Sequence, residues 1–388
     1  LYSRYNAIFR NQTNVVSLSE MNKVLFFASD FKIGLSALLT DELIAFHRSG
    51  INIYAVAGEH EQEFGLSAKI DVENVPISRI EGLDAHANWI GLARILEHLI
   101  LANDIHIVHV QNNWQLALIA FVKYKLLFKH KIGIIYTLHG FRHNSVWKSY
   151  LAQIIIGSAL LLFTDKVICM SSYLKRKFRL LSYKIELLPL GVPTSFFVPE
   201  MPPLPQGGLQ MIFPAQFRHG KNQDVIIRSF AEHVKNTRDD VSKLILPGTG
   251  DLLSEMKALA VQLNIASRVE FPGQLSKEAI RQLYLKSNIG IVSSNSETFG
   301  QSIVEPFVLG RCVVSTPVGI ALDIIKKEEN GYIYNHQKDL VQIMDYLYLH
   351  QDVVKQIGLN NFQQRDLFSW SKISKSYQNR VLRVNEDA

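Results

Sequence analysis

Residues 289–315 read IGIVSSNSETFGQSIVEPFVLGRCVVS, and this stretch decides the fold class. The apolar run Ile289–Val292 predicts a buried strand, Ile303–Leu309 predicts a helix, and Cys312–Ser315 predicts a second strand. Gly300 stands in the polar turn between the first strand and the helix. A strand–helix–strand unit of this kind is typical of α/β proteins with parallel sheets.

The same alternation of apolar runs and amphipathic stretches continues along the chain and predicts two doubly wound sheets. In the first half the expected strands are Lys23–Ala28, Ile51–Val56, Ile105–Val110, Ile132–Leu138 and Lys166–Met170, and the expected helices are Ala37–His47 and Ile90–Leu101. In the second half the further strands are Met211–Pro214, Lys243–Leu246, Val269–Phe271 and Tyr332–Tyr334, and the further helices are Asp224–Val234, Leu252–Leu263, Lys277–Lys286 and Leu340–Tyr348. Ligands of such sheets bind in the crevice at the carboxyl ends of the strands.

A chain of 388 residues is longer than one hydrophobic core usually grows, so we expect two domains. The turn-rich segment 191–208, with five prolines and three glycines, is the expected linker. It separates a first domain at 21–190 from a second at 209–365, and residues 366–388 contain a further helical stretch. Residues 1–20 are interpreted as an N-terminal extension or tag.

The composition is that of an ordinary folded α/β protein, with 47% hydrophobic and 20% charged residues. Cys169 and Cys312 lie in apolar, strand-like runs, which predicts buried free thiols and a reducing compartment. Residues 1–20 lack the apolar stretch of a secretory signal. The longest apolar run, Ile154–Phe163, is about half of the roughly 20 residues that span a bilayer, so we expect no spanning helix.

Positive charge is concentrated in one segment of the chain. Between Ile105 and Ile185 twelve Lys and Arg residues stand against one acid, Asp165, which makes the segment +11 in a chain of net charge +6. Six aromatic residues are interleaved with these cations: Phe121, Tyr124, Phe128, Phe141, Trp147 and Tyr150. Such a surface would attract an anionic membrane, with rings at the lipid interface. The alternative is a solvated basic face over aromatic residues of the core.

Glu297 and Glu305 stand eight positions apart around the predicted helix start. At about 1.5 Å per helical residue, their separation does not much exceed about 12 Å. The unpaired N–H groups and partial positive charge of a helix start suit a diphosphate. One carboxylate would then bind a ribose diol and the other the hydroxyls of a sugar. The alternative is a capping box at Ser302–Glu305, in which Glu305 binds only the Ser302 amide.

The motifs around this pair, in their order along the chain, resemble glycosyltransferase family 4, whose members have the GT-B fold of two Rossmann-like domains. The resemblance rests on the Glu-x7-Glu motif of Glu297 and Glu305, on Gly310, on the strand 313–316 and on the loop 317–319. Further matching stretches are Leu246-Pro247-Gly248-Thr249-Gly250, Val269-Glu270-Phe271-Pro272-Gly273 and Asn330-Gly331. Together they cover roughly residues 21–375, more loosely in the N-terminal half.

The resemblance implies a role for each carboxylate and for each domain. Glu305 would hold the ribose, Glu297 would orient the transferred sugar without acting as a nucleophile, and the backbone of Phe299, Gly300 and Gln301 would meet phosphate. The first domain would bind the acceptor and the second the nucleotide sugar. As in GT-B enzymes, the helical stretch 366–388 would cross back onto the first domain.

Arg218 and Lys221 form a second expected phosphate grip, in a Gly-containing loop after the first strand of the second domain. Two cations at this place would offset the charge that develops on a diphosphate leaving group. Read without the neighbouring motif, both are ordinary surface charges. We therefore expect Arg218 and Lys221, together with Glu297, to take part in catalysis.

Four further residues are expected near the ligand by resemblance. His139 ends a strand at the cleft, where the family has a functional histidine near the transferred sugar, and the resemblance implies that it takes part in catalysis. His109 is the rival, although a lone strand histidine is more often part of the core. Gly34, after the first strand, and Gly248, in the second domain, would let the backbone approach the donor. Asp323 stands where family members have an acid near the donor.

The expected reaction is a metal-independent transfer, and the resemblance implies retention at the anomeric carbon. The chain has no Asp-x-Asp motif and no Cys/His cluster with zinc spacing, and no cofactor is expected. The donor would be a nucleotide sugar, in first place a UDP-hexose or UDP-N-acetylhexosamine. The acceptor would be a saccharide or lipid-linked saccharide of bacterial surface-polysaccharide assembly, met by a cytoplasmic enzyme at the inner face of the plasma membrane.

Three other functions stay open at this point. A GT-B sugar-nucleotide epimerase would use the same fold and donor. An NAD-dependent dehydrogenase is less compatible, because Gly248-Thr249-Gly250 lacks the full Gly-x-Gly-x-x-Gly fingerprint. A non-enzymatic basic module for a membrane or a nucleic acid would explain the charge but leave the glutamate pair without a role, and we do not expect a nucleic-acid partner.

Overall fold

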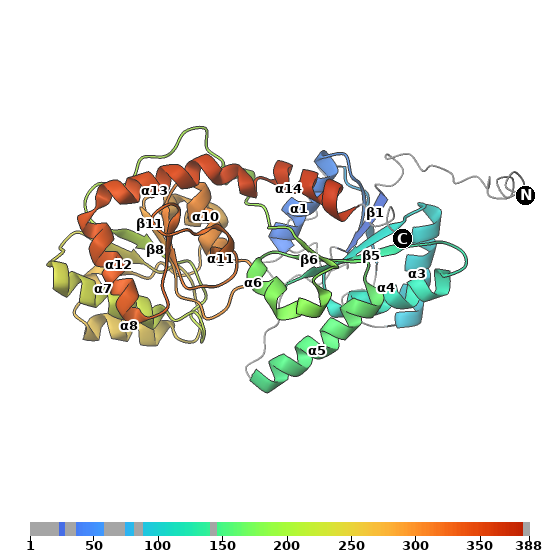
Figure 1. Ribbon diagram of the computed structural model, residues 1–388, viewed down its shortest axis with the longest axis horizontal. Helices are drawn as coiled ribbons and strands as arrows, with labels where there is room; N and C mark the ends of the chain where they lie inside the picture. Colours follow the sequence, from blue (N-terminus) through green and yellow to red (C-terminus); the bar gives the residue numbers. More distant parts are fainter. Residues whose placement is uncertain (1–22, 28–35, 58–73, 81–87, 140–145, 383–388) are drawn as a thin grey trace, which may run out of the picture.

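The structure is a computed structural model that describes residues 23–27, 36–57, 74–80, 88–139 and 146–382. It contains two parallel sheets, one in each half of the chain, each flanked by helices (Figure 1). The expected α/β class with two Rossmann-like domains is therefore confirmed. Most strands are buried, which explains why they read as nearly continuous apolar runs.

The first sheet has seven strands in the order β3-β2-β1-β4-β5-β6-β7, all parallel to their neighbours. Its strands are β1 (Lys23–Phe27), β2 (Asn52–Ala57), β3 (Ile77–Arg79), β4 (Ile107–Val110), β5 (Gly133–Leu138), β6 (Lys166–Cys169) and β7 (Ile185–Leu187). The helices of this half are α1 (Ser36–Arg48), α3 (Trp89–Ala102), α4 (Asn113–Leu126), α5 (Val146–Phe163), α6 (Ser172–Lys175) and the 3₁₀ segment η2 (Arg176–Leu181).

The second sheet has six parallel strands in the order β10-β9-β8-β11-β12-β13. Its strands are β8 (Gln210–Ile212), β9 (Lys243–Ile245), β10 (Val269–Glu270), β11 (Ile289–Val292), β12 (Cys312–Ser315) and β13 (Gly331–Ile333). The helices are α7 (Gln223–Thr237), α8 (Leu253–Gln262), α9 (Lys277–Leu285), α10 (Gln301–Val308), α11 (Ala321–Ile324), α12 (Gln337–Leu349) and α13 (Gln351–Gln364). Short 3₁₀ turns lie at η3 (Thr194–Phe196), η4 (Ala266–Arg268) and η5 (Arg365–Phe368).

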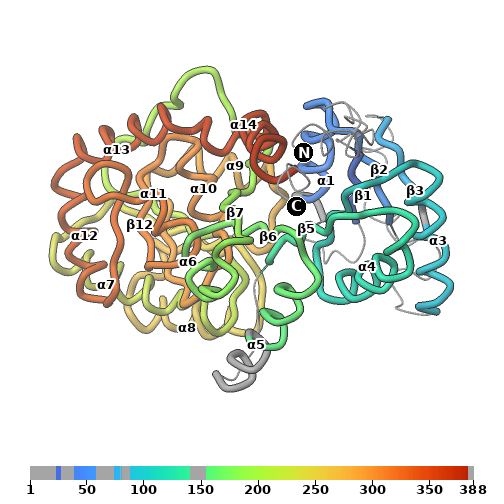
Figure 2. Tube along the Cα trace, turned by 45° about the vertical axis from the view of Figure 1, so that its right-hand side comes forward, coloured from blue at the N-terminus to red at the C-terminus, as the bar shows by residue number. Residues whose placement is uncertain are grey.

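The end of the chain crosses back from the second half to the first. Helix α13 leads to α14 (Trp370–Ser376) and the π-helical turn η6 (Tyr377–Val381), which lie beside α1 (Figures 1 and 2). The Tyr377 ring stacks on Phe46 of α1 with centroids 4.3 Å apart. Arg380 Nη2 donates to Oε2 of Glu186 in β7 at 2.8 Å. The returning segment is therefore packed into the first half.

Some elements carried too little periodicity to be predicted. Strands β3 and β7 have three residues each, and they lie at the two edges of the first sheet. Helices α4 and α5 are apolar on several faces, so neither shows the one-sided pattern of a surface helix. Helix α13 was also missed, although its buried positions recur at helical spacing.

Cys169 and Cys312 are buried free thiols, as expected. Burial raises the pKa of each thiol to about 12, so both stay protonated at neutral pH. Within the described ranges no helix is both long and apolar enough to cross a membrane.

Candidate functional site

The second sheet reverses its strand order between β8 and β11, and the candidate site lies at the carboxyl ends of these two strands. At such a switch point the loops that follow neighbouring strands diverge and leave a crevice for a ligand. In this structure hydrogen bonds connect the loop after β8 with the loop after β11. Asn295 N–H donates to Gly220 O at 2.8 Å, and Ser293 Oγ donates to Lys221 O at 2.6 Å. Asn222 Nδ2 also donates to Ser293 O at 2.9 Å.

Glu297 lies in the loop after β11 and is held by groups from both loops. Its Oε1 atom accepts a hydrogen bond from Ser294 Oγ at 2.6 Å and forms an ion pair with the Lys221 ammonium. The side chains of Lys221 and Glu297 are only 13% and 19% exposed. The structure thus brings two of the expected catalytic residues into direct contact, although they are far apart in sequence.

Helix α10 begins at Gln301, immediately after Gly300, whose φ of 96° only glycine adopts without strain. Ser302 is the second residue of this helix, and its hydroxyl donates to Pro214 O at 3.0 Å. The capping-box interpretation is therefore wrong, because Ser302 does not occupy the N-cap position. The N–H groups of Gln301 and Ser302, the first two residues of the helix, have no partner within it, whereas Ile303 N–H donates to Gly300 O at 2.9 Å. A helix start with such N–H groups can bind an anion.

Glu305 lies one helical turn further on and is almost fully buried, with 5% of its side chain exposed. It pairs with the Lys277 ammonium, which also donates to Gln301 Oε1 at 3.2 Å. Burial, and the nearby Glu305 charge, hold the pKa of the Tyr284 hydroxyl well above its usual range. Lys277 was not predicted as a site residue, because its helix α9 contacts α10 only in the tertiary fold.

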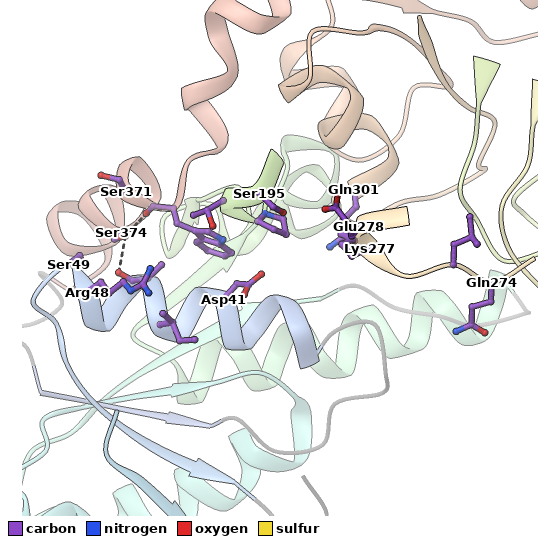
Figure 3. Close-up of a pocket in the computed structure, with 16 residues that line it drawn as sticks. Asp41, Arg48, Ser49, Ser195, Gln274, Lys277, Glu278, Gln301, Ser371 and Ser374 are labelled. Carbon is purple, nitrogen blue, oxygen red and sulfur yellow. Dashed lines mark hydrogen bonds between the residues drawn. The ribbon is translucent and has the colours of Figure 1, made fainter. Parts of the chain in front are cut away.

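A cavity of about 950 Å³ opens beside this pair. Its second-domain wall contains Gln274, Lys277, Glu278 and Gln301, and its first-domain wall contains residues of α1 (Figure 3). Ser49, which follows α1, and Leu275 also line it, and the remaining lining residues come from the linker and the returning helix: Pro193, Thr194, Ser195, Trp370, Ser371 and Ser374. Because Gln301 starts α10, the cavity runs up to the start of this helix. Neither Glu297 nor Glu305 is among the described residues of this wall, and Glu305 is connected to it through its ion pair with Lys277.

The structure gives Gly248 a packing role. Its φ is 145°, and a Cβ atom at this position would lie 2.0 Å from the Ala215 carbonyl oxygen. The loop 247–249 pairs through its backbone with the loop after β8: Ala215 N–H donates to Pro247 O and Phe217 N–H donates to Thr249 O. Gly248 therefore shapes the loop that carries Arg218, whose Nη1 lies 3.5 Å from His219 O.

His139 directly follows β5 of the first sheet and contacts the loop that carries Glu297. Its carbonyl accepts a hydrogen bond from Thr298 Oγ1 at 2.8 Å, and its Nε2 lies 2.7 Å from Gln111 Oε1. Burial lowers the pKa of His139 to about 4, so the ring is neutral at pH 7. Ser171, at the end of β6, also reaches this loop and donates to Thr298 O at 2.7 Å.

His109 is enclosed in the core of the first domain. Its Nε2 lies 2.7 Å from Thr137 Oγ1, and its Nδ1 lies 3.1 Å from the Tyr377 hydroxyl. Burial, and the nearby His139, lower its pKa to about 3. Since all its polar atoms face protein groups inside the domain, His109 is not at the cleft surface.

Asp323 joins the two domains. Its Oδ2 accepts a hydrogen bond from Ser172 N–H at 2.8 Å, at the first turn of α6. Tyr173 OH lies 3.4 Å from Ser296 Oγ in the same contact. The expected position of Asp323 near the donor thus has a second explanation as an interdomain contact. Gly34 lies outside the described residues.

A separate group of potential metal ligands lies at the opposite edge of the first sheet. Asp104, His106 and His130, at the starts of β4 and β5, offer one ligand atom each within 4.8 Å of one another. Their sequence spacing does not match a metal motif, so only the fold brings them together.

Comparisons with known proteins agree with this architecture. Residues 34–196 match the family model described as Glycosyltransferase Family 4, and residues 198–364 match the model described as Glycosyl transferases group 1. The chain is similar to an uncharacterized glycosyltransferase of Methanocaldococcus jannaschii, at 25% identity over 78% of this chain and 81% of that protein. It is also similar to the alpha-monoglucosyldiacylglycerol synthase of Streptococcus pneumoniae, at 23% identity over 70% of this chain and 64% of that protein. A second Methanocaldococcus jannaschii glycosyltransferase aligns over only 43% of its own length.

Solved structures share the fold. Anabaena HepE in complex with UDP superposes with a TM-score of 0.73 at 16% identity, covering 91% of this chain and 98% of that one. A glycosyltransferase from Rickettsia africae superposes with a TM-score of 0.72 at 20% identity, covering 94% of this chain and 99% of that one.

Proposed function

The chain is a group 1 glycosyltransferase with the GT-B fold, and we propose that it transfers a hexose or N-acetylhexosamine from a UDP-sugar to a saccharide or lipid-linked saccharide, with retention. The observation that carries the proposal is the pair of lysine-bound glutamates on either side of an open helix start. A nucleotide sugar has a diphosphate in its middle and hydroxyl groups at both ends. An anion site between two carboxylates matches that distribution of charge and hydrogen-bond donors.

In this proposal the donor lies along the edge of the second sheet. Glu305 accepts hydrogen bonds from the ribose diol, next to the cavity that Gln274 and Lys277 line. The first-turn N–H groups of α10 bind the diphosphate, and Glu297 accepts hydrogen bonds from the transferred sugar. The choice of UDP is supported by the fold relationship to HepE, which has been solved with UDP and with UDP-glucose.

The proposed reaction needs a positive environment for the departing diphosphate. The bond between the anomeric carbon and the phosphate oxygen breaks, the acceptor oxygen bonds to the same face of that carbon, and the acceptor proton passes to the leaving phosphate. Lys221 and Arg218 would offset the charge that develops on this phosphate, in place of a metal ion. Glu297 already holds Lys221 and Ser294, which supports an orienting role rather than attack on the sugar.

The test of this function is a thermal-shift and product screen. UDP-, GDP- and ADP-sugars are compared for stabilisation, and a stabilising donor is then incubated with lipid-linked and free saccharides, with and without EDTA. We expect a UDP-sugar to stabilise the protein and UDP to be released in the presence of an acceptor, with EDTA having no effect. Formation of an epimeric sugar nucleotide without transfer would instead identify an epimerase. Stabilisation by none of the nucleotides would contradict the proposal.

A membrane is the proposed location of the acceptor, at the cytoplasmic face of the plasma membrane. Helices α4 and α5 and segment η2 each precede a strand of the parallel sheet, so their ends meet at its amino edge. We call the exposed residues there the amino-edge patch: the apolar Phe128, Leu162, Leu180 and Tyr183 and the basic Lys129, Lys131 and Arg179. Phe128 is 97% exposed and Leu180 is 89% exposed. Large exposed apolar side chains surrounded by cations suit an anionic lipid interface.

Vesicle binding tests the membrane contact. At low salt the protein is expected to sediment with phosphatidylglycerol vesicles and to bind phosphatidylcholine vesicles much more weakly. Phe128→Ser should reduce this binding several-fold, whereas Leu349→Ser, at a 71% exposed position of α12, should not. If both variants bound the vesicles equally, the amino-edge patch would face solvent and would not contact the membrane.

A further inference from the structure

A line of buried polar side chains runs through the first domain, from the returning C-terminal segment to the candidate site. Tyr377 OH lies 3.1 Å from His109 Nδ1, and Gln111 Nε2 lies 3.5 Å from His109 Nε2. Gln111 Oε1 then lies 2.7 Å from His139 Nε2. The line therefore begins on η6 and ends on the histidine that touches the Glu297 loop.

These polar groups are buried in the core, where burying an apolar side chain would cost less free energy. Tyr377 and His109 are fully buried, and Gln111 is 3% exposed. Each polar group in such a place loses its hydrogen bonds to water and must find a partner in the protein. A fully satisfied polar network inside a domain fixes the orientation of its members more strictly than apolar packing does.

The partners decide which nitrogen of each histidine carries its proton. Gln111 Oε1 is a pure acceptor, so His139 must donate from Nε2. Thr137 Oγ1, at 2.7 Å, and the Gln111 amide both face His109 Nε2, which therefore accepts, and His109 Nδ1 donates to the Tyr377 oxygen. This pattern requires neutral rings. It is consistent with the low pKa values that burial gives both histidines.

Gln111 is itself held in place. Its backbone N–H donates to Gln115 Oε1 at 2.8 Å, and Gln115 lies in the first turn of the following helix. Tyr377 stacks on Phe46 of α1, so its hydroxyl is set by the packing of the returning segment. Gln111 and Tyr377 are thus both anchored by elements outside the site.

We propose that Gln111, His109 and Tyr377 are positioning residues that hold the His139 ring in its Nε2-protonated tautomer and in one orientation beside the donor. The idea rests on the proposed function in one respect, the nearness of His139 to the transferred sugar. The His139 backbone is fixed separately, through the Thr298 hydroxyl of the second domain. The orientation of the His139 ring is thus set by residues of the first domain and its returning segment. Its backbone carbonyl, in contrast, is bound by a residue of the second domain.

The first test reads the tautomer directly. In the full chain labelled with ¹⁵N-histidine, the ring nitrogen shifts at pH 7.5 should show His139 protonated on Nε2, with the signal assigned by its loss in His139→Gln. Gln111→Met, of similar shape but without hydrogen-bonding atoms, should give a mixture of tautomers. Tyr377→Phe should change the ratio of the two His139 tautomers less than Gln111→Met does. Its matched control is Tyr136→Phe, which removes another buried hydroxyl, bonded to Asn113 Oδ1 at 2.8 Å, outside the line.

The second test reads donor binding. Gln111→Met should keep the affinity for UDP within about twofold and lose roughly 2- to 10-fold of the affinity for a UDP-sugar, the effect of one hydrogen bond. A wild-type His139 protonated on Nδ1, or a tautomer that neither variant changes, overturns the positioning role. If the wild type binds no nucleotide sugar, the donor proposal fails, and the tautomer measurement still decides the role of the line.

Discussion

Glu305→Gln is the most informative single change, because it removes a charge and leaves the shape of the side chain unchanged. In the structure this carboxylate is 5% exposed, whereas its partner Lys277 is 43% exposed. After the substitution the Lys277 ammonium turns to water, so little is lost by breaking the pair. We expect the free energy of unfolding to change by less than about 1 kcal/mol.

Donor binding should respond much more strongly than stability. Hydrogen bonds from a ribose diol to a charged carboxylate each contribute about 1.5–3 kcal/mol. A neutral amide in place of the carboxylate weakens these hydrogen bonds, and the loss corresponds to roughly 10- to 150-fold lower affinity for UDP. The low exposure of Glu305 places the expected loss toward the upper part of this range, because water competes poorly there.

Isothermal titration with UDP and denaturant unfolding measure the two quantities on the same samples. Glu278→Gln is the matched control, because Glu278 lines the same cavity, is 57% exposed and pairs with Arg281. It should bind UDP like the wild type. An unchanged UDP affinity in Glu305→Gln, or an equal loss in Glu278→Gln, would refute the assignment of Glu305 to the ribose.

Three further outcomes are expected. Burial raises the pKa of Glu42 from 4.5 to about 8, so the folded chain keeps a proton that the unfolded chain releases, and stability should fall by roughly 1.4 kcal/mol per pH unit between about pH 5 and 8. Glu42→Gln should lack this slope, and denaturant titrations at pH 5, 6, 7 and 8 should show its advantage over the wild type growing with pH. Gly248→Ala should lower stability by roughly 2 kcal/mol or more, whereas Gly157→Ala, whose new methyl group would meet Phe178 at 3.7 Å, should be tolerated; equal melting temperatures would contradict the packing role. Asp323→Ala should cost about 1 kcal/mol of interdomain contact and raise the radius of gyration in X-ray scattering without changing UDP affinity more than about twofold, and a large affinity loss would return Asp323 to the donor site.

Much of the fold follows from local patterns along the chain. Strands such as β11 and β12 are apolar runs bounded by polar turns, and their limits were predicted to the residue. Edge strands β3 and β7 escaped prediction, because three residues carry no periodicity and their pairing depends on β2 and β6. Helices α4 and α5 escaped it because their exposed faces are apolar too, which erases the amphipathic pattern; Tyr124 of α4 and Leu162 of α5 are each 73% exposed.

The composition of the candidate site was predicted in part. The glutamate pair and the basic loop at 218–221 were predicted from their places after strands together with the family resemblance of the surrounding motifs. Lys277 was missed, since no local pattern connects α9 with Glu305. Gln111 was missed too, because only the tertiary fold places its side chain between His109 and His139.

The sequence by itself determined that this chain forms two parallel α/β sheets and carries Glu297 and Glu305 around a helix start, because periodicity and turn residues act within a few positions. Only the tertiary structure decided which groups those carboxylates meet. Lys221 reaches Glu297 because β8 and β11 are neighbours in the sheet. Lys277 reaches Glu305 because α9 packs on α10, and Ser302 lies too far into α10 to cap it. Such contacts depend on strand order and helix packing, which no short stretch of sequence encodes.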